Sequence, residues 1–335
     1  MTIKEMAEQR EETYLSPYAS FSKHTKGRER QETPCDIRPD YQRDRDRILH
    51  CKSFRRLKHK TQVFLSPQGD HYRDRLTHTL EVSQIARTIA GALRLNENLT
   101  EAIALGHDLG HTPFGHAGER ALNRICPEGF IHCEQSLRVV ELLEKKGRGL
   151  NLTWEVRDGI LNHRSSGSPA TLEGKVVRLA DKIAYINHDI DDAERAGILR
   201  EEDVPQQYRR MLGGSLRERL STMIHDIVRN SEEQPDIVQS DDIAYAMKGL
   251  RKFMFQHVYT NSVAKSQESK AEMLVQALYE YYSEHLESLP EEYLVMLYKR
   301  GEGVPKIVCD YISGMSDQYA MAKYSEIFIP KAWQY

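Results

Sequence analysis

The sequence lacks several features that would place it in familiar classes of protein. It has no cysteine pair at CxxC spacing, no apolar run that approaches membrane-spanning length, and almost no strand-like alternation of polar and apolar residues. An odd number of cysteines without a CxxC pair argues against a disulfide framework and against a thiolate zinc site. We therefore expect free, mostly buried thiols at Cys35, Cys51, Cys126, Cys133 and Cys309.

Neither a targeting segment nor an excess of charge of one sign is visible. Residues 1–30 contain Lys, Glu, Arg and Ser throughout, so the apolar region of a secretory signal is missing. The net charge is −3 although 29% of the residues are charged, which is the balance of an ordinary soluble protein. We expect a cytoplasmic location and no membrane partner, and the composition itself names no ligand.

Apolar residues recur at spacings of three and four, the pattern of helices with one buried face. Gly197 and Gly301 follow two of these segments, where a helix C-terminus favours a left-handed residue. The sequence therefore predicts an all-α fold. The predicted helices are 78–95, 100–110, 134–146, 153–163, 172–196, 216–230, 241–264, 270–287 and 291–300.

The chain divides into three predicted regions. Residues 1–40 show little periodicity and contain three prolines, which predicts an irregular N-terminal arm. Residues 41–230 are expected to form the catalytic core. The polar stretch 231–240 is the predicted boundary, after which residues 241–335 form a C-terminal helical region packed on the core.

The pair His107 and Asp108 is the first candidate for chemistry. It stands at the end of a short apolar segment whose predicted helix starts at Thr100, and polar groups in such a place are costly unless they bind something. Neutral imidazole and carboxylate together suit Mn, Fe, Zn, Co or Ni, or Mg where water completes the ligand set. The pair therefore favours a divalent metal, although an isolated His-Asp pair is also common as a solvated or capping pair.

Further residues strengthen the metal prediction. His78 lies on the apolar face of its predicted helix, so its imidazole should point inward. In the 172–196 helix, Asp181, Tyr185 and Asp189 are spaced by four residues and share one stripe. The region between Arg75 and Arg164 is also rich in polar side chains that a helical fold could collect, namely His111, His116, Glu119, His132, Glu134 and His163.

The order His78, His107-Asp108, Asp181 resembles the ligand signature of the HD superfamily. The strings RLTHTLEVSQIAR (75–87), GHDLGHTPFGHAGE (106–119), HCEQSLRVV (132–140) and RLADKIAYINHDIDD (178–192) resemble successive motifs of bacterial dGTP triphosphohydrolase-like proteins, and SFRRLKHKTQVF (53–64) resembles the segment before them. The resemblance spans about Asp44 to Ala196. It implies an HD-domain helical bundle with additional C-terminal helices.

The resemblance also implies roles for individual residues. The implied metal ligands are His78, His107, Asp108 and Asp181. The implied catalytic residues are His116 and Glu119, with His111 on the triphosphate and His132 near the leaving oxygen. The implied substrate contacts are Arg75 and Lys182 on phosphate, and Gln62, Tyr185 and Asp189 on the sugar.

These roles imply metal-dependent hydrolysis of deoxynucleoside triphosphates to deoxynucleoside and inorganic triphosphate. The cofactor would be Mg, Mn or another transition metal. A tyrosine ring beneath C2′ leaves no room for a ribose 2′ hydroxyl. The resemblance further suggests a homo-oligomer.

A basic cluster between Arg43 and Lys60 has eight Lys or Arg and two Asp. It is either a solvated helix face with salt links to Asp44 and Asp46, or a contact for substrate phosphate, for an allosteric nucleotide at a subunit interface, or for single-stranded DNA. The resemblance favours the allosteric nucleotide.

Two other functions stay open at this stage. One is a different HD phosphohydrolase, such as a nucleotidase, a cyclic-nucleotide phosphodiesterase or an alarmone hydrolase. The other is a regulatory nucleic-acid-binding module with a vestigial site.

Overall fold

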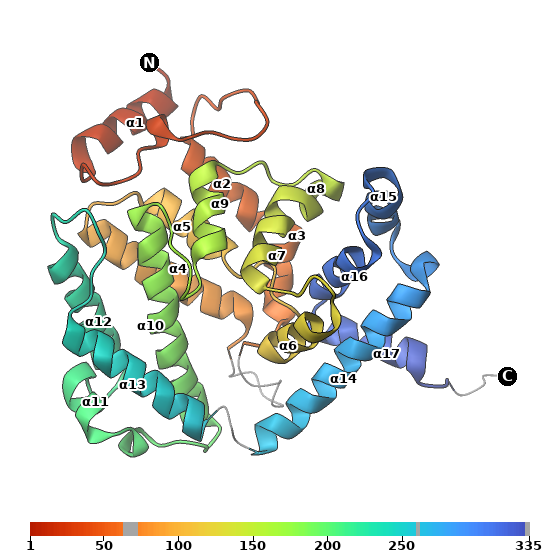
Figure 1. Cartoon of the computed structure of the whole chain (residues 1–335). Coiled ribbons are helices and arrows are strands. Elements are labelled where there is room, and N and C mark those ends of the chain that lie inside the picture. The colour runs from red at the N-terminus through yellow and green to blue at the C-terminus, as the bar shows by residue number, and fades with distance from the viewer. Residues whose placement is uncertain (63–72, 259–261, 332–335) are drawn as a thin grey trace.

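The computed structural model describes residues 1–62, 73–258 and 262–331 and is helical throughout (Figure 1). Within these ranges there is no β-strand, and only two isolated bridges occur, Arg28 with Thr153 and Thr61 with Asp74. The predicted all-α fold is therefore confirmed.

The α-helices begin and end as follows: α1 Ile3–Tyr14, α2 Asp40–Leu49, α3 Lys52–Arg56, α4 Arg75–Ala92, α5 Glu97–Gly106, α6 Gly115–Ile125, α7 His132–Arg138, α8 Glu144–Gly147, α9 Trp154–Asn162, α10 Leu172–Arg195, α11 Gln206–Leu212, α12 Leu216–Ser231, α13 Asp241–His257, α14 Ser262–Glu284, α15 Glu291–Arg300, α16 Val304–Ser313 and α17 Asp317–Phe328.

The predicted helices are present, but two helices near the site start earlier than periodicity predicted. Helix α4 starts at Arg75 because the Asp74 side chain accepts from the Thr77 amide and caps it. Helix α5 starts at Glu97, since Asn96 caps it in the same way, and not at Thr100. Residues 259–261 of the predicted 241–264 helix, and Val63 and Phe64 of the 53–64 motif, lie outside the described residues.

The predicted 134–146 helix is interrupted. It consists of α7, a π-helical turn at Val139–Leu143, and α8. Lys145 and Lys146 have left-handed φ values of 55° and 57°, so regular helix ends before them.

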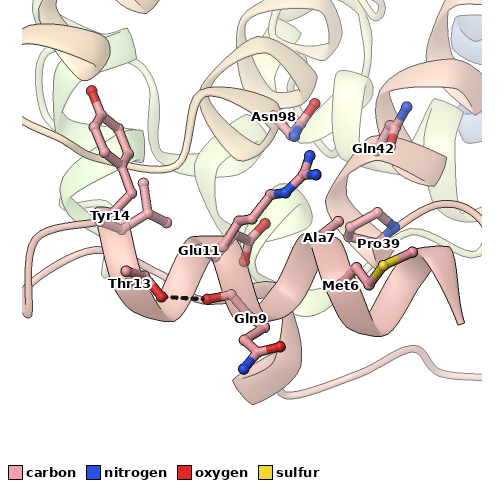
Figure 2. Close-up of a pocket in the computed structure, with 11 residues that line it drawn as sticks. Met6, Ala7, Gln9, Glu11, Thr13, Tyr14, Pro39, Gln42 and Asn98 are labelled. Carbon is pink, nitrogen blue, oxygen red and sulfur yellow. Dashed lines mark hydrogen bonds between the residues drawn. The ribbon is translucent and has the colours of Figure 1, made fainter. Parts of the chain in front are cut away.

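The irregular arm predicted for residues 1–40 does not hold for Ile3–Tyr14, which form α1. Thr2 and Glu5 make a capping box, a local signal that works without an apolar stripe. The helix docks through an ion pair of 2.9 Å from Lys4 to Asp40 on α2. A groove of about 770 Å³ runs between α1 and the α2 and α5 region, with Met6 and Tyr14 along one side (Figure 2).

Hydrophobic packing forms two clusters. The larger one is built on α2, α4, α5, α9 and α10 and includes Met247, Leu250 and Met254 of α13. The smaller one joins α6 to α14, α15, α16 and α17, which lie together on one side of the molecule (Figure 1). The contacts of α13 and α6 thus cross the predicted boundary at 231–240, which stays a prediction.

The structure can also be compared with two sequence predictions, on membrane-spanning segments and on the cysteines. No helix among the described residues is long and apolar enough to cross a membrane. All five cysteines are free, and four of them are buried, as predicted.

Candidate functional site

One cavity of about 780 Å³ collects most of the predicted site residues. Its walls come from α4, the α5–α6 loop, α6, α7, the end of α9, α10 and α13. The predicted site residues on its wall are Gln62, Arg75, His78, Asp108, His111, His116, His132, Asp181, Lys182 and Tyr185. The other three, His107, Glu119 and Asp189, are not on the wall.

The four predicted metal ligands converge at the base of this cavity. Ligand atoms of His78, His107 and Asp108 all lie within 4.8 Å of one another. Asp181 Oδ1 is 3.2 Å from His78 Nε2 and 3.9 Å from His107 Nε2. Two imidazoles and the Asp108 carboxylate are therefore close enough to hold one ion, and the Asp181 carboxylate lies beside both imidazoles. Such groups suit a divalent ion with mixed N and O preference.

Local contacts fix the segment that carries His107 and Asp108. The Ser136 hydroxyl on α7 donates to the His107 carbonyl at 2.7 Å and accepts from the Gly110 amide at 2.9 Å. A Cβ at Gly110 would lie 2.1 Å from the Ser136 nitrogen, so only glycine allows this close approach. The ligand pair is thus held by α7 as well as by α5.

The hydrogen bonds of His107 prepare it to bind a metal. Its Nδ1 donates to the Ala104 carbonyl at 2.6 Å, which leaves the Nε2 lone pair toward Asp108 and Asp181. Nε2 is buried and has no hydrogen-bond partner. An outer hydrogen bond that fixes the tautomer is the usual arrangement for a metal-binding histidine, so the residues present fit a divalent cation.

The carboxylates of the cluster are held in the charged form. Burial alone would raise the pKa of Asp181, but the hydrogen bond with His78 and the charge of His107 hold that pKa well below its usual range. The pKa of Asp108 is lowered in spite of burial by His107 and Arg75. Arg75 Nη1 donates to Asp108 Oδ2 at 2.6 Å.

Glu119 and His132 form a partly buried acid-base pair beside the cluster. Glu119 Oε1 accepts from His132 Nδ1 at 2.9 Å and from the His132 amide at 3.0 Å. Its Oε2 lies 3.5 Å from His116 Nδ1. Burial opposes ionisation of both partners, yet hydrogen bonds from His116 and His132 keep the pKa of Glu119 far below normal, and Glu119 raises the pKa of His132.

His163 was noted in the sequence without a role, and the structure places it against His132. The Nδ1 of His163 donates to the Ile160 carbonyl at 2.7 Å, so its Nε2 can only accept. His132 Nε2 lies 3.2 Å from that atom. Burial, with the charges of His107 and His132, lowers the pKa of His163 to about 4. His132 therefore has an acceptor at each ring nitrogen, which favours its protonated form.

His111 and His116 complete the group of histidines. The His111 ring stacks on His132 with centroids 4.7 Å apart and meets the edge of His116 at 5.4 Å. Burial, Arg75 and His132 lower the pKa of His111. The pKa values of these two stacked histidines on the cavity wall are therefore shifted in opposite directions.

The start of α6, which carries His116, is held by the C-terminal helix α17. Phe114 and Gly115 have positive φ values of 61° and 55°, a conformation that costs energy for phenylalanine. Asp317 Oδ1 accepts from the Phe114 amide at 2.8 Å, and its Oδ2 accepts from the Thr61 amide at 2.9 Å. The C-terminal region thereby orients two segments of the cavity wall.

Of the three residues predicted to contact the sugar, two line the cavity and one is buried behind its wall. Tyr185 lies on the cavity wall, with its ring centroid 6.4 Å from that of His116. Gln62 is also on the wall, and its buried Oε1 has no hydrogen-bond partner. Asp189 is buried one helical turn beyond Tyr185. Their roles in substrate recognition stay predictions, as do the phosphate contacts of Arg75 and Lys182.

Some residues fall elsewhere than the sequence suggested, and others were missed. Glu134 is exposed and does not line the cavity. Motif reasoning missed the contribution of α13, because its cavity-lining residues have the spacing of any amphipathic helix. The cavity-lining residues from α13 and the segment before it are Gln239, Ala244, Met247, Lys248 and Arg251.

The basic cluster between Arg43 and Lys60 is partly neutralised. Asp46 accepts from Arg45 at 2.9 Å, whereas Asp44 is buried and pairs with Arg28 from outside the cluster. Lys60 is buried and donates to the carbonyls of His111 and Ser313. The allosteric nucleotide or single-stranded DNA predicted for this cluster stays a prediction.

Two known family models match separate parts of the chain. Residues 75–186 match the HD domain family, and residues 237–326 match the phosphohydrolase-associated domain family. The first range holds all four predicted metal ligands and the Glu119–His132 pair. The fold and the site therefore define an HD-type phosphohydrolase.

The most specific similarity is to one named group of bacterial proteins. A deoxyguanosinetriphosphate triphosphohydrolase-like protein of Caldanaerobacter subterraneus subsp. tengcongensis is 56% identical over 335 residues, which covers 99% of this chain and 98% of the relative. Proteins of the same name from Clostridium perfringens strain SM101 and Desulfatibacillum aliphaticivorans are 50% and 49% identical, with coverage of 98% or more of each chain. This chain belongs to the deoxyguanosinetriphosphate triphosphohydrolase-like family, as its motifs predicted.

Proposed function

We propose that this protein hydrolyses deoxynucleoside triphosphates to deoxynucleoside and inorganic triphosphate with a divalent metal ion. The observation that carries the proposal is the composition of one cavity of about 780 Å³. The four predicted metal ligands lie in the wall of this cavity or directly support it. His132, which is hydrogen-bonded to Glu119, is also on the wall. So are Tyr185 and Gln62, and the buried Oε1 of Gln62 has no hydrogen-bond partner. The names of the relatives agree with this substrate class.

The residues of the chain divide the chemistry among them. A divalent cation held by His78, His107, Asp108 and Asp181 would neutralise charge on the phosphate that is attacked. Glu119 stabilises protonated His132 through the 2.9 Å hydrogen bond. When substrate binds, His132 can turn its Nε2 proton from His163 to the 5′ oxygen, which is a poor leaving group without a general acid.

Identification of the products tests the proposal. Incubation of the purified protein with each dNTP and each NTP, with Mg²⁺ or Mn²⁺ present, should release inorganic triphosphate and a deoxynucleoside from the dNTPs. A chelator should abolish the reaction. Release of orthophosphate, or ring opening of a cyclic nucleotide without triphosphate release, would instead assign a different HD phosphohydrolase activity. Absence of turnover together with tight, salt-sensitive DNA binding would indicate a regulatory module.

Sugar selectivity should depend on Gln62 and Tyr185 in different ways. Gln62→Leu removes an acceptor oxygen suited to a 3′ hydroxyl, so discrimination against 2′,3′-dideoxynucleotides should fall by roughly 1–3 kcal/mol, the usual cost of an unpaired polar group. Tyr185→Ala should open space at C2′ and admit ribonucleotides. The measurement is kcat/KM for a dNTP, its NTP and its dideoxy analogue.

The wild type supplies the decisive comparison for the sugar contacts. Equal kcat/KM values for NTP and dNTP on the unaltered protein would contradict the proposal that this pocket distinguishes deoxyribose from ribose. Ser221→Ala, an exposed change on α12 outside the cavity wall, is the control and should leave both ratios unchanged.

A further inference from the structure

Helix α6, which carries His116 and Glu119, makes its hydrophobic contacts with the C-terminal helices. Its buried side chains belong to the smaller hydrophobic cluster, together with side chains of α14, α16 and α17 (Figure 1). Among the described residues, the larger cluster of α4, α5 and α10 includes no side chain of α6. Arg120 adds ion pairs with Glu268 and Glu272 of α14. Helix α6 and the C-terminal helices therefore form one packing unit, which we call the C-terminal unit.

The predicted metal ligands stand on a different packing unit. His78 is on α4, Asp181 is on α10, and His107 and Asp108 directly follow α5. Buried side chains of these three helices belong to the larger hydrophobic cluster, which we call the metal-site unit. The cavity thus receives its predicted metal ligands from the metal-site unit and α6 from the C-terminal unit. How the two units dock therefore sets where His116 lies relative to the metal ligands.

Asp317, the first residue of α17, is hydrogen-bonded to both units. Its Oδ1 accepts from the Phe114 amide at the start of α6 at 2.8 Å. Its Oδ2 accepts from the Thr61 amide at 2.9 Å and from the Thr61 hydroxyl at 2.6 Å. The Thr61 carbonyl accepts in turn from Nε of Arg75 on α4 at 3.2 Å, which attaches this segment to the metal-site unit. One carboxylate therefore joins the start of α6 to the segment that carries Gln62.

The two units meet closely at this point. Phe114 has a left-handed φ of 61°, and its side chain is buried in the smaller cluster. A Cβ at Gly115 would lie 3.3 Å from the carbonyl oxygens of Thr61 and Gln62, so the start of α6 runs directly against that segment. A left-handed phenylalanine costs energy unless its surroundings hold it, and the Asp317 carboxylate holds its amide. Loss of Asp317 should therefore release the first turn of α6.

We propose that Asp317 is a positioning residue that docks the C-terminal unit on the metal-site unit, so that His116 and Glu119 stand at a fixed place relative to the metal ligands. This inference rests on the proposed function and extends it, because Asp317 lies in the phosphohydrolase-associated segment, which thereby takes part in turnover. Metal binding should not need Asp317, since all four predicted ligands stand on the metal-site unit. Turnover should need it, because misplacing a reacting group by about 1 Å can cost roughly 10²-fold in rate.

Asp317→Ala removes all three acceptor contacts and tests the proposal. We expect kcat to fall on the order of 10–100-fold, with a much smaller change in KM and with metal content retained. Asp317→Asn keeps one acceptor oxygen and should restore part of kcat. Thr61→Val removes only the hydroxyl contact and should lower kcat least, and it keeps the proposal testable if Asp317→Ala folds poorly. Steady-state kinetics and elemental analysis on the same preparations make the comparison.

Hydrogen exchange reports the docking without turnover. In Asp317→Ala, amide exchange should become faster, on the order of tenfold, in residues 111–119 and stay unchanged in residues 78–92 of α4. Faster exchange in both ranges would indicate a general loss of structure and would contradict the proposal.

Ala320→Gly is the matched control for a general loss of stability. Ala320 is buried on α17, so this change weakens the same helix without removing a contact to Thr61 or Phe114. At a temperature below the Tm of both variants, the control should keep kcat within about twofold of the wild type. The inference is overturned if Ala320→Gly loses as much kcat as Asp317→Ala, if Asp317→Ala stays within about twofold of the wild type, or if Asp317→Ala loses its metal.

Failure of this inference is distinguishable from failure of the proposed function. A wild type that releases no triphosphate from any dNTP would refute the proposed function. Faster exchange confined to residues 111–119 in Asp317→Ala, with metal retained, would still support the docking role in that case. A wild type that releases triphosphate, with Asp317→Ala at the same rate, would refute the inference alone.

Discussion

Asp181→Ala is expected to abolish metal binding and phosphohydrolase activity together while leaving helix content unchanged. Asp181 is the most open of the four predicted ligands, with 26% of its side chain exposed, and its near neighbours at the cluster are His78 and His107. Neither neighbour is a fixed cation such as arginine, so removal of the carboxylate leaves no buried guanidinium without a partner. The loss should therefore fall on the metal and spare the fold.

Elemental analysis and thermal unfolding with and without Mn²⁺ measure this outcome independently of turnover. A ligand that binds only the folded state raises its stability, so Mn²⁺ should raise the Tm of the wild type and leave that of Asp181→Ala unchanged. Glu134→Ala removes an exposed carboxylate on α7 and serves as the control. Retention of metal in Asp181→Ala would contradict its assignment as a ligand.

The paired change His107→Ala/Asp108→Ala should give the same loss of metal and activity, but with a larger effect on stability. Arg75 is buried and donates to Asp108 at 2.6 Å. Removal of that carboxylate leaves a buried guanidinium without its charged partner, which typically costs about 3–5 kcal/mol. The measurement is the Tm of each variant without metal. A lower Tm for the paired variant, with an unchanged Tm for Asp181→Ala, would show that loss of the Arg75–Asp108 ion pair causes the destabilisation.

His132→Ala should lower kcat on the order of 10²–10⁴-fold with metal content retained, because it removes the proposed general acid. His116→Ala and Glu119→Ala should each lower kcat on the order of 10²-fold or more, also with metal retained. Metal loss in any of these variants would move that residue into the ligand set. Elemental analysis and steady-state kinetics on the same preparations make the comparison.

The pH dependence separates the general acid from a merely structural histidine. His132 has a raised pKa, so its protonated form is present below that value and is lost as pH rises through it. Glu119→Gln removes the negative charge and one acceptor, which should lower the pKa of His132 and move the alkaline limb of kcat to lower pH by about one unit or more. An alkaline limb at the same pH in Glu119→Gln would contradict the role of His132.

Much of the site could be predicted from the sequence because its parts lie within short segments. His107 and Asp108 are adjacent, and Asp181 and Tyr185 are one helical turn apart, so their common face follows from helix geometry. The capping box of α1 was also present in the sequence, at Thr2 and Glu5, but it was missed because that helix lacks a clear apolar stripe.

The contacts between segments could not be predicted in this way. His163 meets His132 across 31 residues of sequence, and Asp317 accepts from Phe114 across 203. Lys248 and Arg251 are exposed cations on an amphipathic helix, and such residues in a sequence resemble those on any solvated face. Only the packing of α13 on α10 turns that face toward the cavity.

The sequence by itself determined the helical class and the family, because these depend on periodicity and on motif spacing along one chain. It also predicted the metal ligands, and that assignment stays a prediction. The tertiary structure alone decided which histidines have raised or lowered pKa values, which arginine is already paired, and which cations face the cavity. Protonation and pairing depend on the distances between side chains of different helices and on their burial. Those distances are set by how the helices pack, which residue spacing within a segment does not specify.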